Sequence, residues 1–552
     1  MAALLVEYMA PIMFVALVIF LLLGYPAAFS LGAVGLIFGL IGIELGQFQP
    51  DFLQALPDRI YGVMSNDTLL AIPFFTFMGL VLERSGMAED LLDTIGQLFG
   101  TIRGGLAYAV VFVGALLAAT TGVVAASVIS MGLISLPIML RYGYDRRVAT
   151  GVIAASGTLA QIIPPSLVLI VMADQLGRSV GDMYEGAFIP GLVLAGIYAF
   201  YVFLVTVLFP KATPGLPAEA IGFREANGTR GLTSLGLLTV ASAVFAWFVM
   251  RNSSSHGADY VVLSLFFAIL FAFAVAVVNW VLAHLTGLRF LSLMAQQTTF
   301  VMVPPLFLIF LVLGTIFIGV ATPTEGGAMG ATGALILGAV KRRLTWDLVR
   351  QAAEATAKLS AFVVFILIGA RVFSLTFYGV SGHVWVEHLL TSLPGGQIGF
   401  LIFVNAFVFV LAFFLDFFEL AFIVIPLLGP AAEKLGIDLI WFGVILGVNM
   451  QTSFMHPPFG FALFYLRSVA PRETYLDRVT GKRMEPVTTG QIYWGAVPFV
   501  VIQVIMVVLV ILFPAMVMHY KGAASTVDPT KIKIEVPQID LPPSIDFGQP
   551  PR

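Results

Sequence analysis

The chain has 552 residues, of which 59% are hydrophobic and only 11% are charged, whereas soluble proteins carry roughly 25% charged residues. A soluble domain could not solvate such a surface, so the composition predicts an all-α polytopic membrane protein. The net charge of −3 gives no indication of nucleic-acid binding, and the lack of cysteine excludes disulfides, thiolate metal sites and cysteine nucleophiles. The six histidines form no zinc-type cluster, so we expect neither a cofactor nor an enzyme.

Long uncharged runs predict about twelve membrane crossings, because a helix needs about 20 apolar residues to span the bilayer. One of these runs is interrupted only by Arg371. The predicted crossings are 9–23, 27–44, 65–83, 148–176, 185–209, 232–250, 260–285, 299–319, 326–340, 359–380, 439–466 and 491–515. The first run lacks a basic leader region, so we expect an uncleaved span and not a signal peptide.

Two further segments are predicted as re-entrant hairpins. Residues 104–140 are uncharged, have a small, polar centre, and are flanked by Arg103 and Arg141. Two full crossings would be tight in this length, and a hairpin returns the chain to the same side. Residues 396–430 show a similar pattern, with two acidic residues at the centre.

Basic residues concentrate on one side of this predicted topology. When the loop at 141–147 is placed in the cytoplasm, 19 of the 28 Lys and Arg residues fall on that side. The positive-inside rule then predicts that both termini are periplasmic. The tail at 521–552 is rich in proline and is predicted to be disordered.

The two halves of the chain resemble each other. Pro164-Pro165 matches Pro457-Pro458 at an offset of 293, and Gly143 matches Gly436 at the same offset. Three further matches at similar offsets occur in the same order along the chain. The predicted organisation is a first repeat at 1–210, an insert with two extra helices at 211–291, a second repeat at 292–520, and the tail. Each repeat has five crossings and one hairpin, so the second copy is inverted, which is typical of secondary transporters.

The paired prolines are expected to interrupt two crossings, because proline lacks an N–H donor and disfavours helix before it. Oxygen-bearing side chains precede both breaks and are suitable ligands for a hard cation such as sodium. The candidate residues are Ser156, Gly157, Thr158 and Gln161 at the first break, and Asn449, Gln451, Thr452 and Ser453 at the second. A proline kink that only shapes packing is the alternative for each break.

The predicted hairpin tips carry a second group of candidates. The first tip offers Thr120, Thr121, Gly122 and Ser127, for which close packing of small residues is the alternative. The second tip holds Asp416 and Glu419, whose spacing of three places them on one helix face. A carboxylate within a hairpin is a functional hypothesis by default, although a tip that reaches water needs no partner.

Three other residues are ambiguous. Glu325 is interpreted as a helix N-terminal charge favoured by the dipole. Arg371 could bind a substrate carboxylate, but snorkelling or pairing with an acid is the simpler interpretation. His456 lies beside the second break, where packing is more common than proton relay. Gln161, Arg371 and His456 together form the candidate substrate-binding set.

Over 1–210 and 295–515 the chain resembles the large, DctM-like permease subunit of tripartite ATP-independent periplasmic (TRAP) transporters. Four stretches carry this resemblance. They are Ala155-Ser156-Gly157 through Pro164-Pro165-Ser166, Ala321-Thr322-Pro323-Thr324-Glu325, Phe414-Leu415-Asp416 through Gly436-Ile437-Asp438, and Asn449 through Pro457-Pro458-Phe459-Gly460. The tips and Gln451-Thr452-Ser453-Phe454 further resemble the mannitol/chloroaromatic-type branch, which is linked to 2-oxo acids, hydroxy acids and aromatic carboxylates.

The resemblance implies an elevator-type carrier in the bacterial inner membrane, driven by sodium. A periplasmic binding protein would deliver a small carboxylate substrate, and a small four-helix membrane subunit would complete the scaffold. Sodium sites would fall at tip 119–127 with break 156–161, and at tip 415–419 with break 449–453, with the substrate between the tips. The insert could replace part of the small subunit's role or add contacts to it. A stand-alone carrier without a binding protein is the alternative, followed by a channel or an intramembrane enzyme.

Overall fold

The computed structural model describes residues 2–220, 222, 225, 229–253, 258–457, 460–477 and 479–521. The first half contains α1 (Ala2–Glu7), α2 (Met9–Leu22), α3 (Ala27–Glu44), α4 (Leu56–Met64), α5 (Ala71–Arg84), α6 (Met87–Phe99), α7 (Gly105–Thr121), α8 (Val124–Arg141), α9 (Arg146–Thr158), α10 (Leu167–Gln175) and α11 (Val180–Leu208). The insert contributes α12 (Leu232–Met250) and α13 (Ala258–Thr286). Short 3-10 turns lie at Phe52–Ala55, Asp67–Leu70, Leu159–Gln161 and Ala218–Ala220.

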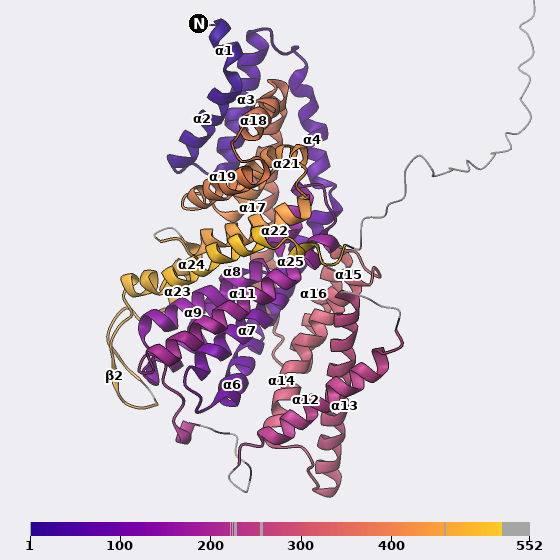
Figure 1. Ribbon diagram of the computed structural model, residues 1–552, viewed down its shortest axis with the longest axis vertical. Coiled ribbons are helices and arrows are strands. Elements are labelled where there is room, and N and C mark those ends of the chain that lie inside the picture. Colours follow the sequence, from indigo (N-terminus) through magenta and orange to yellow (C-terminus); the bar gives the residue numbers. More distant parts are fainter. Residues whose placement is uncertain are drawn as a thin grey trace, which may run out of the picture.

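The second half is also mainly helical (Figure 1). It contains α14 (Leu293–Ile309), a π-helical turn (Phe310–Gly314), α15 (Thr315–Phe317), α16 (Pro323–Val340), α17 (Trp346–Gly379), α18 (Gly382–Thr391), α19 (Gly396–Leu411), α20 (Phe417–Ile423), α21 (Ile425–Lys434), α22 (Leu439–Met450), a 3-10 turn (Gln451–Phe454), α23 (Phe461–Val469), α24 (Thr489–Leu512) and α25 (Ala515–Met518). A two-stranded antiparallel hairpin, β1 (Tyr475–Leu476) and β2 (Arg483–Met484), lies between α23 and α24.

The fold class is confirmed as all-α and polytopic. Within the described ranges, eight helices are long and apolar enough to cross a membrane, or up to ten if two bent pairs each count as one span. The eight are α3, α8, α11, α12, α13, α14 continued through α15, α17 and α24. All except α8 coincide with predicted crossings. Five predicted crossings are not among the eight. Crossings 148–176 and 439–466 are each split into two short helices, 9–23 forms a helix of only 14 residues, 65–83 belongs to one of the bent pairs, and 326–340 is the fifth.

Packing between the halves follows the repeat. Helix α3 packs along α17, and α16 packs along α5. Under the repeat offset α16 corresponds to α3, and the second part of α17 corresponds to α5, so these two contacts are equivalent. The contacts of α9 with α24 and of α22 with α11 are related in the same way. Such crosswise pairing is what two repeats related by a two-fold axis produce.

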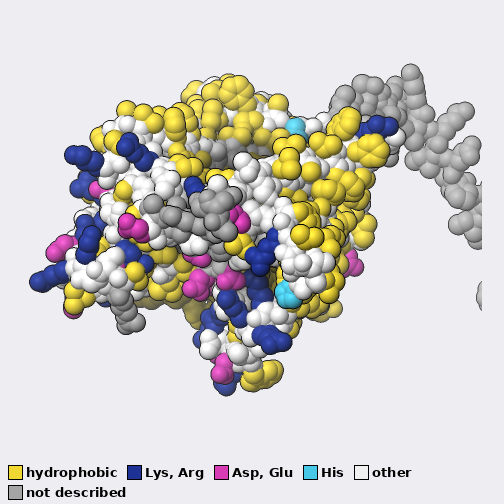
Figure 2. Space-filling model, turned by 90° about the horizontal axis from the view of Figure 1, so that it is seen from below, with side chains coloured by type: hydrophobic (Ala, Val, Ile, Leu, Met, Phe, Trp, Pro, Cys, Tyr) yellow, Lys and Arg dark blue, Asp and Glu magenta, His cyan; other side chains and the backbone are white. Residues whose placement is uncertain are grey.

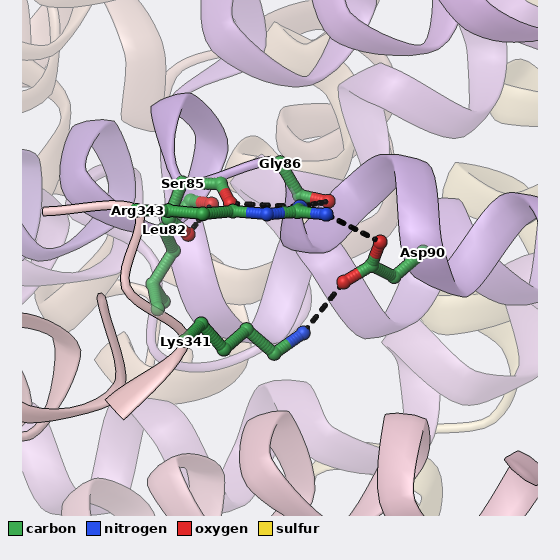
Figure 3. A network of polar contacts seen from close by, with 6 residues as sticks. All are labelled: Leu82, Ser85, Gly86, Asp90, Lys341 and Arg343. Atoms are coloured by element: carbon green, nitrogen blue, oxygen red, sulfur yellow. Dashed lines mark hydrogen bonds and ion pairs between the residues drawn. The ribbon is translucent and has the colours of Figure 1, made fainter. Parts of the chain in front are cut away.

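Hydrogen bonds and ion pairs link the connection between α5 and α6 to the connection between α16 and α17 (Figure 3). Arg343 donates to the carbonyl oxygens of Ser85 at 3.1 Å and Gly86 at 3.0 Å, and also pairs with Asp90 at 3.2 Å. Lys341 binds the other oxygen of Asp90 at 2.7 Å. One connection from each half of the chain is thus held to the other at one end of the molecule.

Lys and Arg side chains gather on the end of the molecule seen in Figure 2. In Figure 1 this lower end carries α6 and the β1–β2 hairpin, whereas α1 lies at the opposite end. Arg103, Lys211, Arg289, Arg342 and Lys482 are among the exposed basic residues of the chain. Only 17% of the α12 span and 11% of the α13 span is buried, so the insert presents most of its apolar surface outward.

The acidic residue of the Pro323 stretch has the structural role expected of it. Glu325 lies in the first turn of α16 and accepts a hydrogen bond from the N–H of Thr322 at 2.8 Å, while the Thr322 hydroxyl accepts one from the N–H of Glu325 at 3.3 Å. This reciprocal capping box satisfies two N–H groups at the helix start. The predicted tail at 521–552 lies, apart from Lys521, outside the described residues.

Candidate functional site

A cavity of about 400 Å³ lies where both predicted hairpin tips and both helix breaks meet. Its walls come from segments that are up to 343 positions apart in the chain, from Gly122 to Tyr465. The lining residues are Gly122, Val123, Val124, Ala125, Gln161, Leu167, Val168, Leu359, Phe362, Asp416, Phe417, Phe418, Phe454, Phe461 and Tyr465. Cavities of this size are typical of ligand sites.

The first tip is the turn between α7 and α8. Gly122 has φ +60°, the left-handed conformation that glycine adopts without strain, and a Cβ there would lie 3.2 Å from the carbonyl oxygen of Pro165. Behind the tip, a Cβ on Gly157 would overlap the Val128 side chain and lie 3.2 Å from the Val128 nitrogen. Two glycines therefore allow the tip to rest directly on the first helix break.

The second tip is organised by its two acids. Asp416 is the N-cap of α20 and accepts a hydrogen bond from the N–H of Glu419 at 2.8 Å, while Glu419 accepts one from the N–H of Asp416 at 3.0 Å. The predicted arrangement on one helix face is wrong, because Asp416 has an extended backbone and precedes the helix. The spacing of three instead produces a capping box. Asp416 lines the cavity.

Both breaks have the same local structure: a helix tightens into a 3-10 turn, opens, and restarts. After Leu159–Gln161 the chain is non-helical until α10 begins at Leu167, and Pro164 and Pro165 lie in this gap. The Ser166 hydroxyl donates to the carbonyl oxygen of Gln161 and accepts from the N–H of Leu169 at 3.4 Å. The second gap contains Pro457, whereas Pro458 lies outside the described residues.

The two breaks are joined by a direct hydrogen bond between repeat-related residues. The Gln451 amide donates to the carbonyl oxygen of Thr158 at 2.9 Å and to its hydroxyl at 3.2 Å. These positions differ by 293, the repeat offset of the paired prolines. Gln503 of α24 donates to the same hydroxyl at 3.4 Å and to the hydroxyl of Tyr198 at 2.9 Å. Sequence reasoning missed Gln503 and Tyr198, although an uncharged polar side chain within an apolar helix is a usable signal.

Most of the predicted site residues at the tips and breaks are buried, whereas Asp416 and Glu419 are half-buried. Thr120, Ser127, Ser156, Thr158, Gln161, Asn449, Gln451, Thr452 and Ser453 are each at most 5% exposed. Some have internal partners: Thr120 donates to the carbonyl oxygen of Leu117 at 3.0 Å, and Asn449 donates to the side-chain oxygen of Asn405 at 2.9 Å. The side chain of Thr121 lies outside the described residues.

Four of these buried oxygens have no hydrogen-bond partner among the described residues. They are Ser156 Oγ, Gln161 Oε1, Gln451 Oε1 and Ser453 Oγ. A buried polar atom without a partner is costly and calls for an explanation such as a bound ion. Hydroxyl and amide oxygens are ligands that hard cations accept, so the residues present fit a cation such as sodium on this criterion.

Two candidates do not line the cavity. Arg371 is exposed and lies nine residues beyond Phe362 on α17, about 13 Å at the helical rise. His456 is buried between the rings of Phe409 and Phe413, with centroid distances of 4.5 and 4.0 Å. The structure therefore brings only Gln161 of the predicted substrate-binding set to the cavity.

Aromatic residues of the cavity wall were not predicted. Phe362 comes from α17, Phe417 and Phe418 follow the second tip, and Phe461 and Tyr465 follow the second break. The spacing of four between Phe461 and Tyr465, directly after a break, is a signal that could have identified them. Nothing in the local sequence of α17 indicates that Phe362 lines the cavity.

Comparisons with known proteins found a family model, several relatives and a solved structure that are similar to this chain. The family model of the tripartite ATP-independent periplasmic transporter DctM component matches residues 14–516. A C4-dicarboxylate TRAP transporter large permease protein of Pseudomonas aeruginosa is 27% identical, covering 85% of this chain and 89% of the relative. An isethionate TRAP transporter permease protein of Oleidesulfovibrio alaskensis is 24% identical, covering 83% and 60%. The crystal structure of the YdaH transporter of Alcanivorax borkumensis aligns with a TM-score of 0.48 at 14% identity, covering 85% and 90%.

Proposed function

Because this chain belongs to the DctM family of large permease subunits of tripartite ATP-independent periplasmic transporters, and is therefore a multi-pass membrane transporter and not an enzyme, we propose that it imports small organic acids and that a sodium gradient drives this import. The single observation that carries the proposal is the shared cavity, which both hairpin tips and both helix breaks line. The named cargoes of two relatives, C4-dicarboxylates and isethionate, are small organic anions.

Sodium coupling is supported by the unpartnered oxygens. In the proposal one sodium ion is held near tip 120–122 by Ser156 and neighbouring backbone carbonyls. A second sodium ion is held near Asp416 by Ser453 and neighbouring oxygen atoms. A bound cation would satisfy these oxygens and draw each tip against its break, which completes the cavity walls. Substrate affinity would then depend on sodium, because the same segments form both sites.

Movement of the cavity across the membrane is proposed to be of the elevator type. The paired helices α3–α17 and α5–α16 would form the fixed scaffold, and the tips with their broken helices would move. The cavity wall includes Leu359 and Phe362 of α17, which supports a cargo site at the boundary between these parts.

The family normally works with a small membrane subunit and a substrate-binding protein, and we extend both partners to this chain. The basic end in Figure 2 is assigned to the cytoplasm by the positive-inside rule. Both termini, and the face that receives the binding protein, would then be periplasmic.

The test is uptake into proteoliposomes. The chain would be reconstituted with its small membrane subunit and supplied with labelled pyruvate, lactate and aromatic acids, with and without a sodium gradient and a cognate binding protein. Uptake that requires both is the expected result. Uptake that requires sodium alone would indicate a stand-alone carrier, and uptake independent of sodium would overturn the coupling.

A further inference from the structure

The cavity has largely aromatic and aliphatic walls, and its polar side chains among the described residues are Gln161, Asp416 and Tyr465. Rings approach it from several elements: Phe362 and Phe418 meet edge to face at 6.2 Å between centroids, and Phe454 and Phe461 lie 6.3 Å apart. Aliphatic side chains of Val123, Leu167 and others fill the remaining wall. Such rings bind flat, apolar groups well, both by area and by ring geometry.

Two parts of the wall can donate hydrogen bonds to an anion, the Gln161 amide and the start of helix α8, and we call these two groups the polar corner. Gln161 lines the cavity and is 2% exposed, and because its Oε1 has no hydrogen-bond partner among the described residues, the amide is free to turn its N–H donors toward the cavity. Helix α8 begins at Val124, and its N-cap Val123 supplies no side-chain cap. The first N–H groups of a helix have no intrahelical partner and favour an anion.

The other two helices that begin at the cavity are already capped by side chains of the protein. Ser166 caps α10, and Asp416 caps α20 through its side chain. No Lys, Arg or His is among the described residues that line the cavity. The Tyr465 hydroxyl is the one further side-chain donor among the described lining residues. A second carboxylate would find only this hydroxyl, aromatic rings and the Asp416 carboxylate, and burying a poorly paired charge is costly. The donors of the wall therefore match one anionic group better than two.

We infer that the cargo is a monocarboxylate with an apolar, ring-sized body, a deepening that rests on the proposed function. Its carboxylate accepts hydrogen bonds from the Gln161 amide and from the start of α8. Its body lies against Phe362, Phe417 and Phe418. Dicarboxylates, the cargo named for one relative, fit this cavity poorly.

Equilibrium binding to the purified full-length chain tests this without a binding protein or a gradient. In sodium buffer, benzoate, terephthalate, acetate and succinate would be titrated while the thermal unfolding temperature is followed, since a ligand that binds the folded state raises it. Benzoate and terephthalate share the ring and differ in the second carboxylate. Benzoate and acetate share the head and differ in the ring.

We expect benzoate to stabilise the protein at a concentration at least roughly tenfold below that needed for each of the other acids. A tenfold difference in affinity corresponds to about 1.4 kcal/mol of binding free energy. Phe418→Leu should lose this preference for benzoate over acetate while still binding both, because the ring is lost and the polar corner kept. Gln161→Leu should weaken both acids. Phe403→Leu, on an exposed face of α19 away from the cavity, is the matched control and should behave like the wild type.

Stabilisation by succinate or terephthalate that equals or exceeds that by benzoate would overturn the inference, as would the absence of any benzoate effect or an unchanged preference in Phe418→Leu. The proposed function would survive these outcomes if uptake of another organic acid still required sodium and the binding protein. Conversely, sodium-independent uptake would remove the coupling but leave the benzoate preference intact.

Discussion

Asp416 has two tasks that a single substitution can separate. It caps α20 and lines the cavity near the proposed second sodium site. Asparagine caps helices about as well as aspartate, so Asp416→Asn should preserve the tip and remove only the charge. We expect the sodium concentration for half-maximal uptake to rise roughly tenfold, the equivalent of about 1.4 kcal/mol of lost attraction.

The control for this variant is Glu325→Gln, which alters an acid of a similar capping box that is exposed and outside the cavity. Its sodium dependence should match the wild type. If Asp416→Asn also shows the wild-type sodium dependence, Asp416 takes no part in sodium binding.

Asp477 provides a pH-dependent contact outside the membrane-spanning segments. Its carboxylate accepts hydrogen bonds from the Thr480 hydroxyl at 2.6 Å and from Arg141 at 2.9 Å. The Thr480 hydroxyl, with smaller help from Arg141 and against some desolvation, lowers the pKa of Asp477 to about 2. Since the unfolded value is about 3.9, the contact stabilises the fold above about pH 4, and this contribution is lost as the pH falls towards 2.

Asp477→Asn should therefore lower the thermal unfolding temperature by the same amount between pH 5 and pH 8. The difference from the wild type should shrink when the pH is lowered from 4 to 2. Glu354→Gln breaks the more exposed Arg350–Glu354 pair and should change little at any pH. A difference for Asp477→Asn that stays constant down to pH 2 would contradict the assignment.

At the scale of the helix, close approach sets the packing of α9 on α24. A Cβ on Gly151 would overlap the carbonyl oxygen of Gly495 and lie 3.0 Å from the Phe499 ring. Backbone cannot move aside as a flexible side chain can. Gly151→Ala should therefore destabilise the protein by about 1–3 kcal/mol, the usual effect of overpacking, seen as a lower thermal unfolding temperature in detergent.

Gly196→Ala is the matched control, because it lies within α11 and a Cβ there meets no heavy atom within 4 Å. Alanine is favoured over glycine in a helix interior by roughly 0.5–1 kcal/mol, so this variant should be neutral or slightly more stable. Equal unfolding temperatures for the two variants would show that the α9–α24 contact is looser than the structure has it.

The helix breaks illustrate what a sequence reveals about such a fold. Paired prolines act on their own backbone, so both interruptions could be located from the amino-acid sequence alone, and Gly122 marked the first turn for the same reason. The position of Phe362 depends on how α17 packs against a tip more than fifty residues away, and no local pattern encodes that. Arg371 and His456 are cases in point, because charge and chemistry suggested a site whereas packing places both outside the cavity lining.

For the whole molecule, the crosswise contacts of α3 with α17 and of α5 with α16 define a candidate scaffold. The hydrogen bond between Thr158 and Gln451 joins the two broken helices at equivalent positions. Both breaks are thus tied to each other, while α17 packs against the second tip through α20, with Phe362 and Phe418 in ring contact. An elevator motion requires slippage at this second contact and none within the scaffold.

Because the chain lacks cysteine, engineered cysteine pairs can test this directly. Phe362→Cys with Phe418→Cys would join α17 to the second tip, replacing rings 6.2 Å apart. Phe29→Cys with Phe365→Cys would join α3 to α17, replacing rings 5.1 Å apart within the scaffold. Each pair would be treated with a short, reducible thiol cross-linker, and uptake would be compared before treatment, after it, and after reduction.

We expect cross-linking of the first pair to abolish uptake and reduction to restore it, because the cargo cavity can no longer slide past α17. The second pair should transport at the same rate in all three states. Comparing each pair with its own untreated form removes any loss caused by the substitutions themselves. Full transport through the cross-linked Phe362–Phe418 pair would mean that α17 travels with the tips, and the boundary between moving and fixed parts would have to lie elsewhere, at the contacts of α3 or α16.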